Sequence, residues 1–465
     1  MSIFSALLIL FTITNLVLNN YRNAFTYQLA FSIYIWCFIG VGSFLNTPII
    51  RIDFWQISSL LTLLMGLKLI FSYRRVSIKL LVFISIILAN VIYLIVNPLG
   101  MSVVVGHGGN YEYVLGGMDY YKMPSFSKFT VFNASLAISQ AIIAFIAFRI
   151  LKHEDRLRLV VLLSIPIKIT FFIVIFEYLL KYFGYGFIYD YILSFFFGFT
   201  PSGLTSEIGE RGGGFLLQGM NREGAHLVLS LFTGVLILFT NYIIEKDKKR
   251  NLIFAITGII MMLLSMSFTM ILSFGIIVCM YGTYVFYNRA SKIKITRLLS
   301  SIIVFALFCF ATFSLISQNN YILSRVESAF EDLDFLINIY TLYSQTFTEL
   351  SSTMSRLVTI IESFYILTLR PIMGLGLGTH FSHGTTGLTL AEIGILGFAS
   401  YVFFYFYSWK DLNHKFLYFT LVFYWIFLNV FISVPQNTLV LRGDTIIVSI
   451  CLYFIVNSIR QKKVV

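Results

Sequence analysis

The chain has 465 residues, of which 58% are hydrophobic and only 12% are charged. A soluble domain carries about 25% charged residues, so this composition excludes an ordinary water-soluble protein. The formal net charge is +12, but the Lys and Arg residues cluster in short breaks between apolar runs, which favours membrane topology over nucleic-acid binding. The four cysteines all lie within apolar runs and lack the paired spacing of metal sites or disulfides.

Apolar runs long enough to cross a bilayer as helices recur from end to end, since about 20 helical residues cross about 30 Å of hydrocarbon. The sequence therefore predicts one all-α membrane domain over residues 1–465, a polytopic bundle of twelve to fourteen spans. The first run, Ile3–Leu18, lacks the basic start and cleavage site of a secretory signal and is interpreted as a retained span. The thirteen predicted spans are 3–20, 26–47, 54–72, 80–99, 129–150, 159–183, 225–244, 251–266, 270–287, 298–317, 386–408, 416–434 and 445–459.

Basic residues are concentrated in alternate breaks between these spans. By the positive-inside rule these breaks face the cytoplasm, which places the C-terminus inside and, with thirteen spans, the N-terminus outside. An error at the hairpin Ser265–Met270 would reverse the upstream orientation. Three long breaks then lie outside, at about 100–128, 184–224 and 318–385.

The last two outer loops are predicted to form a cap that holds the active site. Within 318–385, apolar residues recur every three and four positions over Ile322–Leu336 and Ser355–Leu369, which predicts two helices. The stretch 184–200 is rich in Phe and Tyr and is predicted to lie at the membrane interface, where aromatic rings are favoured. An amphipathic lipid would enter beside it.

Six arginines lie in the outer breaks, where topology selects against positive charge. The planar guanidinium suits phosphate and pyrophosphate oxygens, so a convergence of several would make a site for a pyrophosphate-linked lipid. Ordinary ion pairs are the alternative for each of them, with Glu207, Glu210, Glu327, Asp332 or Asp334 as the partner. They are Arg211, Arg222, Arg325, Arg356, Arg370 and Arg442.

The first candidate motif runs from a glycine-rich turn at Arg211 and Gly214 to Asn221 and Arg222, directly before the seventh span. Glycine allows close approach of the backbone to a ligand. Asn221 stands where a helix N-cap is expected, and the free amides of a helix start favour an anion. A flexible turn without a ligand is the alternative interpretation.

The second candidate motif runs from Arg356 through the glycine turn 370–378 to His380 and His383, and then to Glu392 at the start of a late span. A histidine outside the membrane near arginines suits a neutral base that accepts a proton. A surface or capping role is the alternative, and it is favoured for His380.

Other charged residues give weaker signals. Asp332 and Asp334 resemble a metal-binding pair but are interpreted as a solvated helix face, so the sequence predicts no metal site and no cofactor. Glu177 lies within an apolar run near its outer end, where an ionisable group is expected to face the protein interior. It is predicted to help line the site.

These motifs resemble the O-antigen polymerase and O-antigen ligase superfamily of bacterial membrane glycosyltransferases. The family's Arg-x-x-Gly and Asn-x-x-Gly patterns look like Arg211 with Gly214 and Asn221 with Gly224. Two positions depart from the family: Gly384 replaces the Asn that usually follows the histidine, and Ser267-Phe268 replaces a Ser-Arg pair. The family's second pattern looks like Arg356, Pro371, Gly374, Gly376, Gly378, His383, Leu390, Glu392, Gly394 and Gly397.

The resemblance implies a GT-C-like helical fold and a metal-independent transfer of a growing glycan. The glycan would move from undecaprenyl pyrophosphate onto an incoming undecaprenyl-pyrophosphate-linked repeat unit, at the periplasmic face of the inner membrane. Arg211 and Arg356 would hold the pyrophosphate and stabilise its growing charge, while His383 would orient or deprotonate the acceptor hydroxyl. The implied substrate contacts are Arg222, Arg370, Asn221, Gly214, Gly376, Gly378, Glu207 and Glu392.

The implied partners are undecaprenyl-pyrophosphate-linked oligosaccharides, membrane lipid and a polysaccharide chain-length regulator, with no nucleic acid. Two alternatives stay open. A ligase would transfer the same glycan to lipid A-core, and the divergent motifs and extra spans favour the polymerase over it. A lipid-linked oligosaccharide flippase is more distant, because a transporter predicts short outer loops and charged residues buried within its spans.

Overall fold

The structure is a computed structural model, and it describes most of the chain. Two sequence predictions, the tenth span at 298–317 and the helix Ile322–Leu336, lie outside the described residues, as does nearly all of the first outer loop. The structure leaves out residues 1, 41–42, 47–50, 74–75, 97–125, 127, 199–216, 222–223, 245–248, 266–267, 290–351, 381, 433–437 and 462–465.

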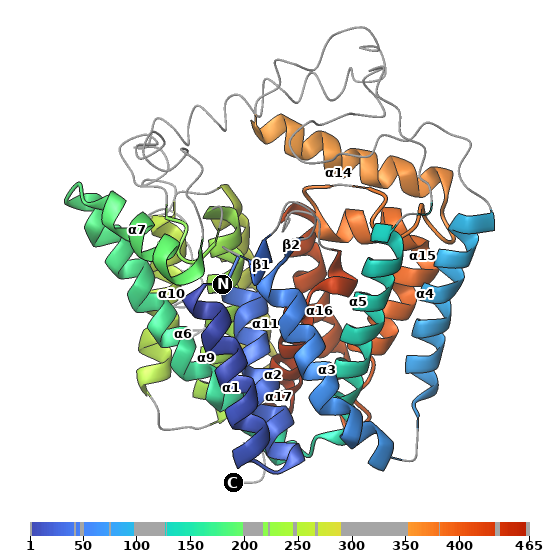
Figure 1. The fold of residues 1–465 in the computed structure, drawn as a ribbon, viewed down its shortest axis with the longest axis horizontal. Coiled ribbons are helices and arrows are strands. Elements are labelled where there is room, and N and C mark those ends of the chain that lie inside the picture. The colour runs from blue at the N-terminus through green and yellow to red at the C-terminus, as the bar shows by residue number, and fades with distance from the viewer. Residues whose placement is uncertain are drawn as a thin grey trace, which may run out of the picture.

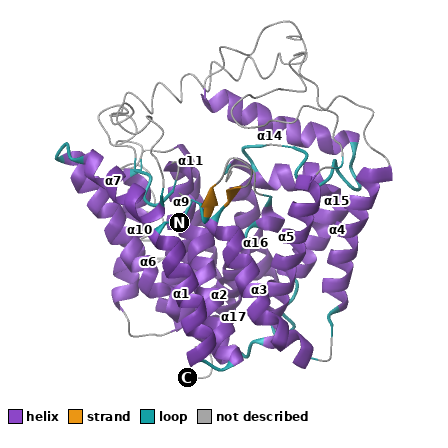
Figure 2. Ribbon diagram, viewed as in Figure 1, coloured by secondary structure: helices purple, strands orange, loops and turns teal. Residues whose placement is uncertain are grey.

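The described residues form a bundle of helices with one small two-stranded ribbon (Figures 1 and 2). The ribbon pairs β1 (Leu45–Asn46) with β2 (Arg51–Ile52) in antiparallel register. The helices are α1 (Ile3–Leu18), α2 (Tyr21–Phe38), α3 (Phe54–Ser72), α4 (Ile78–Val96), α5 (Lys128–Phe145) with a π-helical turn Ile146–Ile150, α6 (His153–Tyr182), α7 (Gly186–Phe197), α9 (Gly224–Ile244), α10 (Lys249–Leu264), α11 (Phe268–Arg289), α14 (Ser352–Leu369), α15 (Thr385–Tyr405), α16 (Lys415–Phe431), a 3-10 turn Leu439–Leu441 and α17 (Asp444–Gln461).

Within the described part of the chain, seven helices are long and apolar enough to cross a membrane: α3, α4, α5 with its π-helical turn, α6, α9, α11 and α15. The chain is therefore a multi-pass membrane protein with an all-helical bundle, as the sequence predicts. Each predicted span other than 298–317 overlaps a helix. In particular, α10 and α11 are separate helices, so the prediction of two spans on either side of Ser265–Met270 was correct.

The boundaries of the second predicted span were wrong. That span was expected over 26–47, whereas α2 ends at Phe38 and Leu45–Asn46 belongs to the ribbon. The apolar run continues past the end of the helix, so hydropathy alone does not show where the helix stops. The amide of Gly40 donates instead to the carbonyl of Met220 at 2.8 Å.

The helices differ in how much of their surface meets other helices. In the apolar 18-residue segment of each helix, 78% is buried in α9 but only 28% in α4. Helix α9 is therefore central and α4 is peripheral. On α4 the exposed side chains other than Ser85 are apolar, for example Ile92 at 59% exposure and Val96 at 76%. Such a surface matches hydrocarbon rather than water.

Polar side chains inside the bundle pair between helices. Ser32 of α2 and Thr62 of α3 form a hydroxyl–hydroxyl bond of 2.7 Å, and the Gln140 amide of α5 donates to Ser59 at 2.7 Å. Without water in the bilayer core, such groups need partners within the protein.

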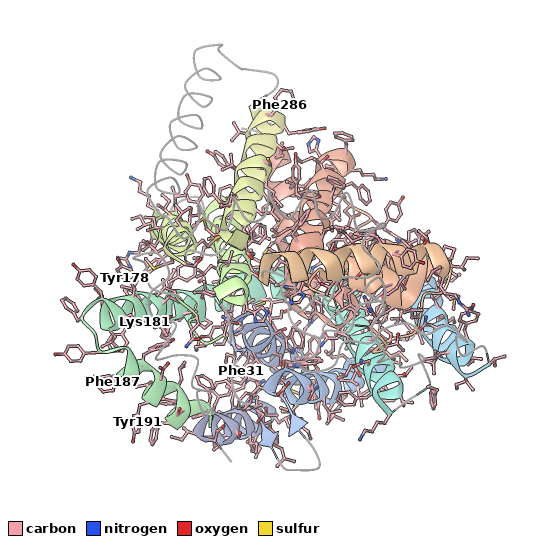
Figure 3. The ribbon with its side chains drawn as sticks, turned by 90° about the horizontal axis from the view of Figure 1, so that it is seen from above. Phe31, Tyr178, Lys181, Phe187, Tyr191 and Phe286 are labelled. Carbon is pink, nitrogen blue, oxygen red and sulfur yellow. The ribbon has the colours of Figure 1, made fainter. Side chains whose placement is uncertain are left out.

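The two termini lie at opposite ends of the bundle (Figure 1), which agrees with an odd number of spans. The end at which α9 and α15 begin is called here the loop end, and the end at which α4 and α16 begin is called the basic end. Helix α14, predicted over Ser355–Leu369, lies across the loop end (Figures 1 and 3).

The aromatic stretch predicted at the membrane interface contains the helix α7. Its residues Tyr189 and Leu193 are buried, whereas Phe187 is 68% and Tyr191 is 72% exposed. Both exposed rings lie at the edge of the molecule (Figure 3). Helix α7 is thus amphipathic, and its position at a bilayer interface stays a prediction.

A candidate active site at the loop end

Helix α15 is broken at Gly394, whose φ is 66° and ψ is −174°. This backbone conformation is essentially restricted to glycine. A regular helix would join the amides of Ile395 and Leu396 to the carbonyls of Ala391 and Glu392, four residues earlier. The break frees these two amides and two carbonyls inside a membrane helix.

The glycine turn of the second motif, residues 371–376, satisfies all four freed groups. The two amides donate to the carbonyls of Pro371 and Ile372 at 2.8 and 3.2 Å. The two carbonyls accept from the amides of Leu375 and Gly376, both at 2.8 Å. Because unpaired backbone groups are costly in a bilayer, the turn and the broken helix form one hydrogen-bonded unit.

Two glycines of the motif are required by this close approach. A Cβ on Gly374 would lie 2.5 Å from the carbonyl carbon of Glu392, and one on Gly394 would lie 2.3 Å from the carbonyl oxygen of Ile372. Both glycines also have a positive φ. The fold alone therefore explains why positions 374 and 394 of the motif are glycine.

Glu392, predicted to contact substrate, is turned inward. Its side chain is buried at 2% exposure, and one carboxylate oxygen accepts the amide of Gly378 at 2.8 Å. The same carboxyl group thus fixes the end of the glycine turn, to which Gly376 and Gly378 also belong.

Asn90 of α4 supports the turn from the opposite side. Its side-chain amide donates to the carbonyls of Met373 at 2.5 Å and Glu392 at 3.1 Å. Its side-chain oxygen accepts the amide of Leu377 at 3.3 Å. Asn90 is fully buried, and a buried amide is tolerated in a span when its hydrogen bonds are satisfied.

Replacing Asn90 is expected to loosen the turn without removing a charge. Asn90→Leu keeps the size of the side chain but leaves the amide of Leu377 without its acceptor, which costs about 1–3 kcal/mol. We expect the free energy of unfolding in mixed detergent–SDS micelles to fall by that amount. Ser135→Leu, an exposed position on α5 whose hydroxyl bonds only its own helix, is the control and is expected to change little. Equal stability of the two variants would contradict this role of Asn90.

Arg370, at the end of α14, is held by the same helix α4. Its guanidinium donates to the hydroxyl of Tyr93 and lies over the Tyr93 ring at 5.4 Å from the centroid. The side chain is half-buried at the loop end.

The two histidines of the motif both meet α14. His380 Nε2 lies 3.3 Å from the Ser363 hydroxyl, and His383 Nδ1 lies 3.0 Å from the Thr359 hydroxyl. Thr359 and Ser363 are four residues apart, so they share one face of the helix. His380 is buried and His383 is half-buried, and both rings are therefore held in fixed positions.

The glycine directly after His383 has a structural reason. A Cβ on Gly384 would lie 2.1 Å from the carbonyl oxygen of Val430. The backbone of α16 thus occupies the space that an Asn side chain would need. His383 is positioned instead through its backbone amide, which donates to the Thr359 hydroxyl at 3.1 Å.

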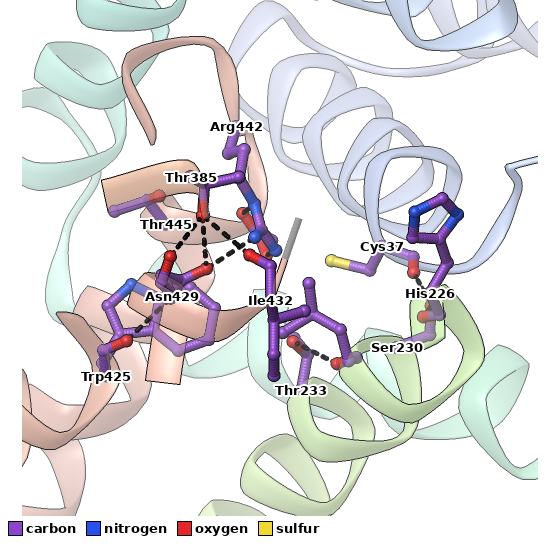
Figure 4. A network of polar contacts seen from close by, with 12 residues as sticks. Cys37, His226, Ser230, Thr233, Thr385, Trp425, Asn429, Ile432, Arg442 and Thr445 are labelled. Carbon is purple, nitrogen blue, oxygen red and sulfur yellow. Dashed lines mark hydrogen bonds and ion pairs between the residues drawn. The ribbon is translucent and has the colours of Figure 1, made fainter. Parts of the chain in front are cut away.

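Arg442 is one of the six outer arginines, and it does form an ion pair, but with Asp444, which was not among the predicted partners. It is buried, and its guanidinium forms two hydrogen bonds with the Asp444 carboxylate, one of 3.1 Å from Nε. Another guanidinium nitrogen donates to the Asn429 side chain at 2.7 Å. The hydroxyl of Thr385, two residues after His383, donates to the same Asn429 oxygen at 3.1 Å (Figure 4).

The end of the first motif is held by Glu177 of α6. The buried carboxylate accepts the amides of Gln218 at 3.0 Å and Gly219 at 2.7 Å, and it pairs with Lys181 at 2.7 Å. The prediction that Glu177 faces the interior was correct. In the structure it fixes the turn before α9.

Asn221 is buried at 5% exposure, but it is not the N-cap that the sequence predicted. Helix α9 begins three residues later, at Gly224. The amide of Asn221 closes a turn onto the carbonyl of Gln218 at 3.0 Å, which places Asn221 ahead of the helix.

The end of α2 contacts the first motif on one side and the segment before α17 on the other. On one side, Gly40 donates to Met220 in the first motif. On the other, Trp36 packs so closely on Gly443 that a Cβ there would lie 2.0 Å from the ring. Arg442 and His226 lie on the two sides of Cys37 (Figure 4), so the end of α2 lies between the start of α9 and the segment before α17.

Several predicted site residues cannot be placed. Arg211, Gly214, Glu207 and Arg222 lie outside the described residues. Arg356 belongs to α14, but its side chain is outside the described part. The convergence of arginines on a pyrophosphate therefore stays a prediction.

Asn90, Thr359 and Asn429 were not predicted as site residues from the sequence. Asn90 and Asn429 each interrupt an apolar run, which is a signal of a buried polar contact. Among the described residues, no three His, Cys, Asp or Glu side chains are grouped so that they could hold a metal ion. Asp332 and Asp334 are outside that part of the chain.

Comparisons with protein-family models, with curated proteins and with solved structures found no match.

Proposed function

We propose that this chain is an O-antigen polymerase of the bacterial inner membrane. It would transfer a growing glycan from undecaprenyl pyrophosphate onto an incoming undecaprenyl-pyrophosphate-linked repeat unit at the periplasmic face, without a metal ion. The observation that supports this proposal most directly is the unit formed by the second motif. Its glycine turn is built into the broken helix α15, and its histidines lie at the loop end against α14.

In the proposed reaction, an acceptor hydroxyl oxygen forms a bond to the anomeric carbon of the donor sugar. The bond from that carbon to the pyrophosphate oxygen breaks, and undecaprenyl pyrophosphate leaves with the electron pair. Arg211 and Arg356 are proposed to hold the pyrophosphate, since negative charge grows on it in the transition state.

His383 is the proposed base for the acceptor hydroxyl. In the tautomer in which Nδ1 donates to the Thr359 hydroxyl, Nε2 carries the lone pair that accepts the proton. The backbone amide of His383 is bonded to the same hydroxyl, so the ring orientation is set before substrate binds. Such preorganisation is what a proton acceptor needs.

The first experiment is to delete the gene in its native host and separate the lipopolysaccharide on a gel. Core carrying a single repeat unit is expected, because ligation of the unpolymerised unit still proceeds. Core without any repeat would contradict the polymerase and point to the ligase or to a flippase. An unchanged ladder would contradict all three.

His383→Ala is expected to lower polymerisation by a factor of about 10² to 10⁴, the usual contribution of a general base. The deletion strain complemented with this variant should therefore show mainly core with a single repeat. His414→Ala is the matched control, since His414 lies beyond the other end of α15, at the basic end. It should restore the full ladder at an equal level of membrane protein. A full ladder from His383→Ala would remove His383 from the mechanism.

A further inference from the structure

Cations converge on one flank of the basic end. The Lys79 ammonium, at the start of α4, donates to the carbonyl oxygen of Tyr407 after α15. It also lies over the rings of Phe403 at 4.1 Å and Tyr407 at 4.3 Å. Arg149 from the π-helical turn and Lys410 from the α15–α16 connection are close enough to repel it electrostatically. Three elements far apart in sequence therefore bring like charges together.

These three cations have no carboxylate partner among the described residues, where no ion pair includes any of them. A fourth cation, Arg156, lies over the Trp409 ring at 4.8 Å. Arg149, Asp411 and Asp155 all act on it electrostatically, and Asp155 is already paired with Arg22 at 2.8 Å. With Arg22 included, two carboxylates face five cations, so the region keeps an excess of positive charge. An anion held between Lys79, Arg149 and Lys410 would relieve their repulsion.

The surroundings of this cluster are apolar and exposed. Phe403 is 44%, Tyr407 45% and Ile78 74% exposed. Ile78 belongs to the membrane-crossing helix α4 and Phe403 to the end of α15, and Tyr407 follows directly after α15. Aromatic rings beside cations at a helix end are typical of the boundary between hydrocarbon and water. The anion that fits this place therefore carries acyl chains.

We infer that Lys79, Arg149 and Lys410 form a binding site for the phosphate headgroup of an anionic phospholipid. The acyl chains would lie along the exposed side of α4 and α15, and the phosphate would face the three cations. Basic pockets between membrane helices bind anionic headgroups in this way. The site is at the opposite end of the bundle from the candidate active site, so the inference does not depend on the proposed function.

The test uses the full-length protein in a neutral detergent, titrated with phosphatidylglycerol or phosphatidylcholine, with bound lipid counted by native mass spectrometry. The wild type is expected to bind phosphatidylglycerol roughly a hundredfold more tightly than phosphatidylcholine. The variant Lys79→Gln/Arg149→Gln/Lys410→Gln should lose this preference. Equal affinity of the wild type for the two lipids would overturn the inference.

The matched control is Lys249→Gln/Arg250→Gln, which removes exposed cations from the other flank of the basic end, at the start of α10. It should keep the wild-type preference. The single variant Lys410→Gln provides a second test if the triple variant misfolds, because Lys410 is exposed and its replacement should not disturb folding. This single change should weaken phosphatidylglycerol binding about fivefold. Wild-type binding by a folded Lys410→Gln or triple variant would overturn the inference.

Excess inorganic phosphate separates a lipid site from a site for a soluble anion. It should leave bound phosphatidylglycerol in place, because the acyl chains contribute to binding. Displacement of the lipid by phosphate alone would contradict a lipid site.

Discussion

Gly394→Ala is expected to destabilise the chain by at least about 3 kcal/mol. The backbone of Gly394 occupies a region that costs a residue with a side chain about 1–3 kcal/mol. The added Cβ would also lie 2.3 Å from the carbonyl oxygen of Ile372 and 2.7 Å from the amide nitrogen of Met373. Backbone atoms cannot move aside as a flexible side chain can, so the turn would separate from α15. The free energy of unfolding, measured by titrating SDS into detergent micelles, checks this.

Gly275→Ala in α11 is the control for that experiment. A Cβ at this position meets no atom within 4 Å, and alanine is a better helix former than glycine by about 1 kcal/mol. The control should therefore be as stable as the wild type or slightly more so. If Gly394→Ala unfolded at the same SDS concentration as Gly275→Ala, the described break in α15 would be wrong.

Arg442→Met is expected to destabilise the chain by about 3–5 kcal/mol, the usual consequence of removing one partner of a buried ion pair. The side chains of Arg442 and Asp444 are only 6% and 4% exposed. The change leaves the Asp444 carboxylate buried without its cation, and the Asn429 oxygen loses a donor. The same SDS titration measures the effect.

Two further variants test the physical cause of this loss. Arg442→Met/Asp444→Asn should be more stable than Arg442→Met alone, because no unpaired charge remains in the interior. Arg22→Met, at the opposite end, breaks a pair with Asp155 whose side chains are 33% and 15% exposed. Partly solvated pairs contribute about 1 kcal/mol or less, so this control should be mild. A double variant less stable than Arg442→Met would contradict the charge-based explanation.

The sequence was sufficient to find most helices because a bilayer imposes one length and one polarity on every span. Helix α2 ends at Phe38 within an apolar run, so the length and polarity of the run did not show where the helix ends. The helix over Ser355–Leu369 was predictable from its periodicity, although its position across the loop end was not.

The sequence by itself also determined which residues make the second motif, because glycines, histidines and a carboxylate stand out in an apolar chain. Only the tertiary structure decided how they are held. Asn90 bonds to Met373, far away in sequence, and His383 bonds to α14. The sequence of a helix shows how apolar its surface is, whereas these contacts depend on which helices pack together. In a medium without water, the packing selects a partner for each freed backbone group and each buried side chain.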